Sequence, residues 1–291
     1  MKVVTTAREL AAEWETARRS GAVIGYVPTM GALHEGHLSL VDLARAECDL
    51  VICSIFVNPL QFGPDEDFDS YPRPVERDLG LLESRGTGVA FLPDWLEIFP
   101  RRERTLADFG THVSVPRLSG QLCGRSRTGH FDGMVTESLL FLNLVRPDRT
   151  YWGEKDFQQL RIIETLVQDL RLPVTVVRGA TRREADGLAM SSRNKNLTPE
   201  ARAAAPGLPR TLQEARAALM GGASLPEVLA TTREALDALG FAVEYLVACE
   251  EESLTEVSTL DGPAAVRVFA AATLGGVRLI DNVRVTEERR G

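Results

Sequence analysis

Residues 22–40 read AVIGYVPTMGALHEGHLSL and predict a strand that turns into a helix. The apolar run at 22–28 has the length and composition of a buried strand. From Gly36 onward, apolar residues recur at helical spacing, at Leu38, Leu40 and Val41. A second continuous apolar run, LVICSIFVN at 50–58, predicts another strand. The order strand, helix, strand within so short a segment is typical of a parallel sheet.

The same alternation continues on both sides of this segment. Upstream, Thr6 and Glu9 form a capping-box pattern that opens a helix, which extends to about Arg19 and ends at Gly21. Downstream we expect helices at 74–85, 132–145 and 155–171, and strands at 88–93, 150–153 and 173–179. Strands that are buried on both faces and alternate with helices predict an α/β fold. We therefore expect a doubly wound parallel, Rossmann-like sheet over residues 1–181.

The pattern changes after about Thr181. A polar loop, RREADGLAMSSRNKN, leads into Ala-rich helices at about 198–239, with capping patterns at Thr198-Pro199 and, as a second capping box, at Ser224 with Glu227. Three strands follow at 241–250, 264–273 and 277–285, and Gly275-Gly276 is typical of a hairpin turn between the last two. We therefore predict a smaller C-terminal α+β domain at 182–291.

Size, charge and cysteine content exclude several classes of protein. With 291 residues and 31.9 kDa, the chain is about twice the commonest single-domain size. Its 33 Lys and Arg against 41 Asp and Glu give a net charge of −8, which disfavours general binding to nucleic acid or to an anionic membrane. The N-terminal residues lack an uninterrupted apolar core, so we expect neither a signal nor a transit peptide. No apolar run has membrane-spanning length, and four cysteines without CxxC spacing suit a reducing cytoplasm.

Ligands of open parallel sheets bind at the carboxyl ends of the strands, and PTMGALHEGHLSL at 28–40 follows the first predicted strand. The free N–H groups at the start of the following helix suit a phosphate, and His34 and His37 can donate hydrogen bonds to its oxygens. Gly36 allows a ligand to approach the backbone. Two histidines alone would be better explained as a metal pair or an ordinary helix start, because neither the residue type nor the spacing is rare. Only His112 and His130 remain as further histidines, and no other zinc ligands are obvious.

Two later segments have similar positions. GLAMSSRN at 187–194 follows the last strand of the first domain, and its two hydroxyls and Arg193 can surround a triphosphate. WGEKDFQQL at 152–160 follows a short strand, where Lys155 can balance phosphate charge and Asp156 can hold a ribose. Taken singly, the first is better explained as an ordinary Ser-containing loop, and the second as a capped surface helix.

The combination of HxGH at the first strand-to-helix turn with the MSSR loop resembles the adenylyl-transferring superfamily that includes class I aminoacyl-tRNA synthetases. Five segments, PTMGALHEGHLSLV, FVNPLQFGPDEDFDSYPR, SRTGHFDGMVT, VRPDRTYWGEKDFQQL and DGLAMSSRN, are in this order and spacing similar to the pantothenate synthetase (pantoate–β-alanine ligase) family. The similarity extends from about residue 23 to residue 197. It implies an enzyme that adenylates pantoate with ATP, releases pyrophosphate, and transfers the pantoyl group to β-alanine with release of AMP.

The resemblance also implies site residues. It gives His37 as the proton donor, with His34 beside it. Because acyl adenylation needs charge dispersal at the α-phosphate, we expect both histidines to stabilise the transition state, with Lys155, Ser191, Ser192 and Arg193 completing the cradle. The positions that match the family's ATP site are Met30, Gly31, Ala32, Leu33, His34, Glu35, Gly36, His37, Gly153, Glu154, Lys155, Asp156, Arg182, Met190, Ser191, Ser192 and Arg193.

Two glutamines match the family's acid-binding positions. Gln61 and Gln159 match the pantoate-binding glutamines, and Gln61 also lies near the β-alanine site by the same resemblance. Asn58, Arg127 and His130 either line the same cavity or stabilise loops. The resemblance further implies Mg²⁺ with ATP, a homodimer, and a C-terminal domain that acts as a lid.

Some positions depart from the family pattern. Thr128 stands where proline is usual and Leu140 where a lysine is frequent, and Glu137 lies among apolar residues. Arg77 and Asp78 stand where an acidic pair is expected, so the magnesium ligands stay open, and Arg182 replaces a small apolar residue that contacts adenine, which we expect it to do through its backbone.

Two other functions are compatible with parts of the sequence. A nucleotidyltransferase that moves AMP onto a phosphate-bearing substrate shares HxGH and the fold, but it needs a second basic cluster, and the glutamines suit a carboxylate better. A non-catalytic RNA-binding module is disfavoured by the charge of −8 and by the lack of a basic stripe with stacking aromatics. Nucleic-acid binding would also weaken steeply with salt.

Overall fold

The computed structural model describes residues 1–63, 66, 68–101, 103–262 and 265–285. The chain divides into two compact units. Unit 1 comprises Met1–Gly120, Gly124–Glu154 and Gln159–Ala180, and unit 2 comprises Gln121–Cys123, Lys155–Gln158 and Thr181–Gly291. The units differ from the predicted domains 1–181 and 182–291, because two short segments that lie before residue 181 belong to unit 2.

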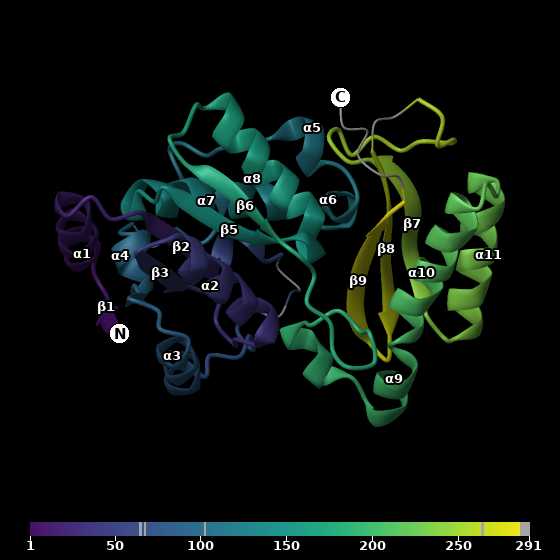
Figure 1. The fold of residues 1–291 in the computed structure, drawn as a ribbon, viewed down its shortest axis with the longest axis horizontal. Helices are drawn as coiled ribbons and strands as arrows, with labels where there is room; N and C mark the ends of the chain where they lie inside the picture. Colours follow the sequence, from purple (N-terminus) through teal and green to yellow (C-terminus); the bar gives the residue numbers. More distant parts are fainter. Residues whose placement is uncertain (64–65, 67, 102, 263–264, 286–291) are drawn as a thin grey trace. The chain divides into compact units, whose positions relative to one another are not determined.

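Unit 1 contains a six-stranded, entirely parallel sheet (Figure 1). Its strands are β1 (Lys2–Val4), β2 (Ile24–Thr29), β3 (Leu50–Ile55), β4 (Val89–Phe91), β5 (Arg149–Gly153) and β6 (Thr175–Gly179). They lie in the order β1-β4-β3-β2-β5-β6. From β2 the chain winds outward through β3 to β4, and it then returns to the other side of β2 as β5. The reversal of winding therefore lies between β2 and β5, as in doubly wound sheets.

Helices cover this sheet and connect its strands. The longer ones are α1 (Ala7–Arg19), α2 (Glu35–Glu47), α3 (Val75–Ser84), α7 (His130–Val145) and α8 (Phe157–Asp169). Short helical turns are α4 (Trp95–Ile98), α5 (Pro116–Ser119), α6 (Cys123–Ser126), η1 (Pro59–Gln61), η2 (Leu106–Asp108) and η3 (Glu154–Asp156). The predicted capping box of Thr6 and Glu9 is present at the start of α1. Strand β1 and the turns α4 to α6 were not predicted from the sequence.

The core of unit 1 lies between the sheet and its helices. One cluster joins Val27 and Val51 of the strands to Leu38 and Val41 of α2, all of them at most 1% exposed. The apolar runs that predict β2 and β3 are thus explained by burial on both faces.

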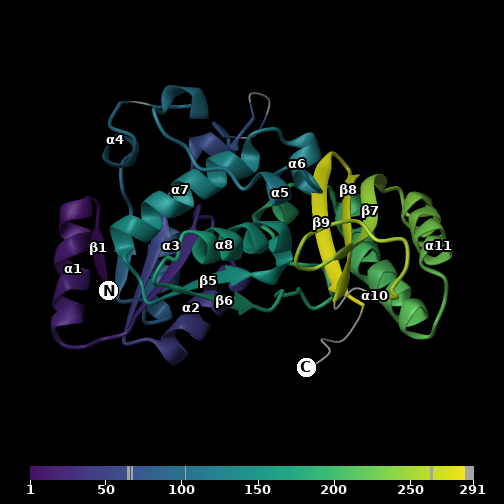
Figure 2. The ribbon, with the colours of Figure 1, turned by 90° about the horizontal axis from the view of Figure 1, so that it is seen from above.

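Unit 2 has a three-stranded antiparallel sheet in the order β7-β8-β9, with α10 and α11 beside it (Figure 2). Its elements are η4 (Ser192–Asn196), α9 (Pro199–Ala204), α10 (Gly207–Met220), α11 (Leu225–Ala238), β7 (Ala242–Glu250), β8 (Val266–Leu274) and β9 (Val277–Arg284). The predicted hairpin turn is present, because Gly275 and Gly276 have φ of 55° and 78° between β8 and β9.

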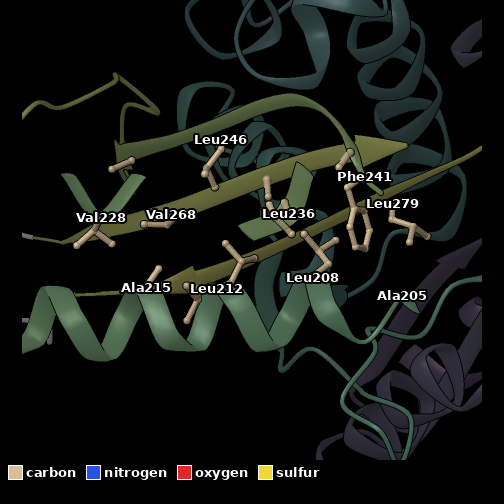
Figure 3. Close-up of a cluster of buried hydrophobic side chains, with 14 of the residues drawn as sticks. Ala205, Leu208, Leu212, Ala215, Val228, Leu236, Phe241, Leu246, Val268 and Leu279 are labelled. Atoms are coloured by element: carbon tan, nitrogen blue, oxygen red, sulfur yellow. The ribbon is translucent and has the colours of Figure 1, made fainter. Parts of the chain in front are cut away.

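The hydrophobic core of unit 2 lies between this sheet and its helices (Figure 3). Leu208 and Leu212 of α10 and Leu236 of α11 meet Val268 of β8 and Leu279 of β9 there. The fold class predicted from the sequence, a doubly wound parallel sheet followed by a smaller α+β part, is confirmed.

One predicted capping box is wrong. Ser224 is the N-cap residue of α11, but its side chain makes no capping hydrogen bond. Pro226 follows in the first turn and has no N–H, which removes one of the two donors that an N-cap hydroxyl can accept from. Among the described residues, no helix is both long and apolar enough to cross a membrane.

Candidate active site

Two of the predicted segments lie at the switch point of the parallel sheet. The HEGH segment follows β2. Gly153 ends β5, the neighbouring strand on the side where the winding reverses, and Glu154 follows it. Open α/β sheets bind ligands in the crevice at this point, at the carboxyl ends of the strands. The topology of unit 1 therefore brings the start of α2 and the end of β5 to the usual ligand-binding edge.

The loop before α2 has an unusual backbone that a buried carboxylate holds in place. Gly31 and Ala32 have φ of 80° and 49°, and Ala32 lacks the freedom that glycine has in this region. The N–H groups of Ala32 and Leu33 donate to the two oxygens of Asp78, at 2.7 and 2.9 Å. Arg77 donates to the carbonyl of Leu33 at 3.0 Å.

These contacts show what Arg77 and Asp78 do at the positions where the family pattern has an acidic pair. Asp78 is fully buried, and both of its oxygens accept backbone hydrogen bonds. It shapes the loop, and the neighbouring Arg77, a cation, supports the same loop through the carbonyl of Leu33. Neither residue has the open oxygen ligands that Mg²⁺ needs. No cluster of three or more His, Cys, Asp or Glu residues suited to a metal occurs within the described part of the chain.

The two histidines of HEGH form a reciprocal N-cap at the start of α2. Nδ1 of His34 accepts from the N–H of Gly36 at 3.1 Å, and Nδ1 of His37 accepts from the N–H of His34 at 3.4 Å. Their ring centroids are 4.0 Å apart. Because a backbone N–H can only donate, each Nδ1 is the acceptor, and the hydrogen-bond pattern assigns the proton of each neutral ring to Nε2. The two residues are therefore brought together with a donor on the far edge of each ring, beside the positive end of the helix.

Gln61 is held by a network that includes three residues left open in the sequence analysis. Its side-chain oxygen accepts from Asn58 at 3.0 Å, and its amide nitrogen contacts the sulfur of Met30 at 3.4 Å. Arg127 donates to Nε2 of His130 at 2.9 Å. The proton of the His130 ring is therefore on Nδ1, which donates to the backbone carbonyl of Gln61 at 2.7 Å. Asn58, Arg127 and His130 thus have a loop-stabilising role that fixes Gln61.

A glutamate anchors this network at its outer end. Glu66 makes two hydrogen bonds to the Arg127 guanidinium, at 2.6 and 2.7 Å. Burial by itself raises the pKa of Glu66, but the hydrogen bonds and charge of Arg127 outweigh it and hold the pKa below its ordinary value. The ion pair is therefore intact at neutral pH.

The two consecutive glutamines at 158 and 159 have different surroundings. Gln158 is 5% exposed and bridges two backbone groups, donating to the carbonyl of Gln121 at 2.6 Å and accepting from the N–H of Cys123 at 3.1 Å. Gln159 is half-buried in unit 1, and among the described residues its side chain makes no hydrogen bond. The pantoate-binding role expected for Gln159 stays a prediction.

The remaining predicted ATP residues belong to unit 2. A tight hairpin, with hydrogen bonds from Met190 N to Arg182 O at 3.0 Å and from Glu184 N to Leu188 O at 2.8 Å, leads into MSSR. Ser191 caps η4 and accepts from the N–H of Arg193 at 3.3 Å. Arg182 is exposed, and its carbonyl is already engaged by Met190. The carbonyl oxygen keeps a second lone pair, so the expected backbone contact with adenine stays a prediction.

Lys155 also belongs to unit 2, although it is adjacent in sequence to Glu154 of unit 1. Its ammonium lies 3.5 Å from the Asp156 carboxylate. His34, His37, Gln61 and Gln159 are therefore carried by one compact unit, and Lys155 and MSSR by the other.

The family model described as pantoate-beta-alanine ligase matches residues 2–284 of the chain. The chain belongs to the pantoate–β-alanine ligase family. It is similar to the pantothenate synthetase of Cereibacter sphaeroides, with 48% identity over 284 residues that cover 97% of this chain and 99% of the relative.

Solved structures of the family share the fold. The pantothenate synthetase of Thermus thermophilus superposes with a TM-score of 0.89 at 43% identity, covering 99% of this chain and 100% of the other. The pantoate–β-alanine ligase of Francisella tularensis, complexed with beta-gamma ATP and β-alanine, has a TM-score of 0.80 at 32% identity and covers 99% of each chain. The family assignment made from the five motifs is confirmed.

One departure from the family pattern has a clear electrostatic consequence. Glu137 lies on α7, and burial of its carboxyl raises its pKa to about 8. The structure gives no comparable consequence for Thr128 or Leu140. The position of Asp78 against the HEGH loop was missed in the sequence, because 46 residues separate Asp78 from Ala32 along the chain.

Proposed function

We propose that this member of the pantoate–β-alanine ligase family condenses pantoate with β-alanine, converting ATP to AMP and pyrophosphate. The observation that supports this most strongly is the pair of imidazoles at the start of α2, each with its proton on Nε2 and both at the switch point of the sheet. Two fixed donors beside a helix N-terminus suit a reaction in which negative charge grows on a phosphate. The Francisella relative, with its bound ATP derivative and β-alanine, supports the same substrates.

In the first step, a carboxylate oxygen of pantoate attacks the α-phosphorus of ATP. A new bond between this oxygen and phosphorus forms, the bond to the bridging oxygen breaks, and pyrophosphate leaves with the electron pair. We assign charge stabilisation to Nε2–H of His34 and His37 and, from unit 2, to Lys155, Ser191, Ser192 and Arg193. No proton needs to move in this step, so the histidines act as hydrogen-bond donors and not as general acids.

Gln61 and Gln159 are the proposed pantoate-binding residues, with Gln61 also near β-alanine. A primary amide both donates and accepts, so it can hold a hydroxyl and a carboxylate without acting as a nucleophile. The network of Asn58, Arg127 and His130 supports this role, because it fixes the backbone and side chain of Gln61 before a substrate binds.

In the second step, the neutral amine of β-alanine attacks the carbonyl carbon of pantoyl adenylate. The amide bond forms, the bond to the phosphate oxygen breaks, AMP leaves with the electron pair, and the amine nitrogen loses one proton to water. Keeping both steps in one site raises the effective concentration of the reactants and limits hydrolysis of the adenylate. We propose that the C-terminal domain, 182–291, serves this purpose as a lid.

We propose that Mg²⁺ enters as part of the substrate, bound by the phosphate oxygens of ATP and by water. The described residues contain no metal-binding cluster, and Asp78 is occupied by backbone N–H groups. Mg²⁺ commonly keeps several waters and binds through substrate phosphates. A homodimer is proposed from the family alone.

A cytoplasmic location is proposed as well. It is supported by the proposed use of ATP and by four buried cysteines without CxxC spacing.

The experiment is an assay of pyrophosphate and AMP with Mg-ATP, pantoate and β-alanine, in which each acid is omitted in turn. The proposal predicts that pyrophosphate release needs pantoate and that steady AMP formation needs β-alanine as well. Activity that does not depend on pantoate would overturn the acid specificity assigned to Gln61 and Gln159. AMP transfer to a phosphate-bearing acceptor would favour the nucleotidyltransferase alternative.

A further inference from the structure

Strand β9 carries two adjacent buried polar residues that the sequence motifs do not include. Asp281 is 2% exposed and Asn282 is 5% exposed. Neighbouring residues of a strand point to opposite faces of the sheet. Asp281 is on the same side as Leu279 and Val283, which belong to the core against α10 and α11. Asn282 is on the opposite side, paired in register with Phe269 of β8.

Asp281 binds the hairpin that leads into MSSR. Both of its oxygens accept from the guanidinium of Arg183, at 2.6 and 2.9 Å, and Arg183 also donates to the carbonyl of Gly187 at 3.1 Å. The hydrogen bonds to Asp281 raise the pKa of Arg183 above its ordinary value, in spite of partial burial. A bidentate pair of this kind fixes orientation as well as distance. The base of the hairpin is therefore tied to β9 just before the chain reaches Ser191.

Asn282 binds the other segment of unit 2 that is expected to contact the nucleotide, Lys155–Gln158. Its amide nitrogen donates to the backbone carbonyl of Lys155 at 3.0 Å, and its amide oxygen accepts from Arg267 at 2.5 Å. These two contacts fix which end of the amide faces Lys155, because a guanidinium can only donate.

A charged network on the same face keeps Asn282 in this orientation. Arg267, 5% exposed, donates to Glu251 at 2.8 Å, and Arg284 pairs with the same carboxylate. The Arg267 guanidinium also lies 4.0 Å from the ring centroid of Phe157, two residues after Lys155. The segment 155–158 is thus anchored to the face of the sheet that carries Asn282, through the Lys155 carbonyl and through the ring of Phe157.

We propose that Asp281 and Asn282 are positioning residues for ATP. From opposite faces of β9, Asp281 sets the position of MSSR and Asn282 sets the position of Lys155, so that one rigid strand fixes the spacing between the two groups of phosphate ligands in unit 2. This inference rests on the proposed function for the identity of the phosphate ligands. Neither residue contacts the reacting atoms.

The test uses near-isosteric variants of the full chain. Asp281→Asn keeps the shape but loses the bidentate pair, and Arg183→Lys weakens the same pair while keeping the charge. Asn282→Asp keeps an acceptor for Arg267 and replaces the donor to Lys155 by an oxygen. It should fold, because the new carboxylate faces a cation. The matched control is Thr232→Val, which removes the hydroxyl that donates to Val228 within α11, remote in the fold from both segments.

The expected result is a change in ATP binding without a change in binding of the acids. Each of the three β9-related variants should raise the Kd and KM for Mg-ATP about ten-fold and leave the KM for pantoate and β-alanine within about two-fold. Hydrogen–deuterium exchange should rise at 182–193 in Asp281→Asn and Arg183→Lys, and at 153–158 in Asn282→Asp. Thr232→Val should lower the Tm and leave ATP affinity unchanged.

Two results would overturn the inference. One is unchanged ATP affinity in Asn282→Asp and Arg183→Lys when both are folded. The other is an equal loss of ATP affinity in Thr232→Val, which would indicate general loosening. Measuring turnover of the wild type distinguishes a failure of this inference from a failure of the proposed function. If the wild type binds Mg-ATP but releases no pyrophosphate with pantoate, the proposed function fails, while the ratios of ATP Kd still decide the role of β9.

Discussion

Replacement of Asp78 by asparagine is the sharpest perturbation of the HEGH loop. The carboxylate is fully buried, and its oxygens accept from Ala32 at 2.7 Å and from Leu33 at 2.9 Å. In Asp78→Asn, one oxygen becomes an NH₂ group that faces a backbone N–H, so one charge-assisted hydrogen bond is lost. Such a bond contributes about 1.5–3 kcal/mol.

The same change releases a strained backbone. Ala32 has φ of 49°, a conformation that costs a non-glycine residue about 1–2 kcal/mol and persists only where the surroundings enforce it. With one anchor gone, we expect the loop to leave the conformation that presents His34 and His37. A loss of about 2 kcal/mol corresponds to an increase of about 30-fold in the KM for Mg-ATP.

The assay is steady-state pyrophosphate release with Mg-ATP and pantoate varied separately, together with thermal unfolding of each variant. The control is Asp42→Asn, which changes an exposed carboxylate of α2 that pairs with Arg85. It should leave both KM values unchanged. The reasoning is refuted if folded Asp78→Asn keeps the wild-type KM for Mg-ATP, or if the KM for pantoate rises by as much as that for ATP.

Three further predictions concern other parts of unit 1. His37→Ala should lower the rate of adenylation by about 10²-fold or more, measured as pyrophosphate release, while the Tm stays close to that of the wild type, and near-normal release would count against its role. Gly133→Ala places a Cβ 1.9 Å from the carbonyl oxygen of Leu60, so it should shift η1, raise the KM for pantoate and lower the Tm. An unchanged KM would show that the position of Gln61 is not critical. Glu137, whose folded pKa of about 8 exceeds the ordinary value, is protonated in the folded state and ionised in the unfolded chain between about pH 5 and pH 8, so its contribution to stability is lost as pH rises through that range. Between pH 6 and pH 8 this loss should be about 2 kcal/mol in the free energy of unfolding of the wild type, and it should be absent in Glu137→Gln. Parallel pH profiles of the two proteins would contradict the assignment.

Local sequence patterns predict the parts of the fold that depend on local physics. The capping box at Thr6 uses residues three apart, and the Gly275-Gly276 turn requires two positive φ angles that glycine adopts readily. The buried strands of the sheet appear as continuous apolar runs. The capping box at Ser224 fails for an equally local reason, since Pro226 takes away a donor.

The parts of the site that could not be predicted depend on contacts between distant residues. Nothing in the sequence around Asp78 indicates that it binds the backbone of Ala32, and nothing around Asn282 indicates a bond to Lys155. Gln158 and Gln159 are adjacent and of the same type, and only the fold shows that the first is used by the backbone of Gln121 and Cys123. The motifs locate the site, and the tertiary contacts decide which of its residues are already engaged.

The central claim, that a pantoyl adenylate is an intermediate, is tested most directly by isotope exchange between labelled pyrophosphate and ATP in the absence of β-alanine. If the first step forms an enzyme-bound adenylate and is reversible, label should enter ATP only when pantoate is present, and His37→Ala should slow the exchange. Pantoate-independent exchange, or no exchange from an enzyme that makes pantothenate once β-alanine is added, would contradict the two-step account.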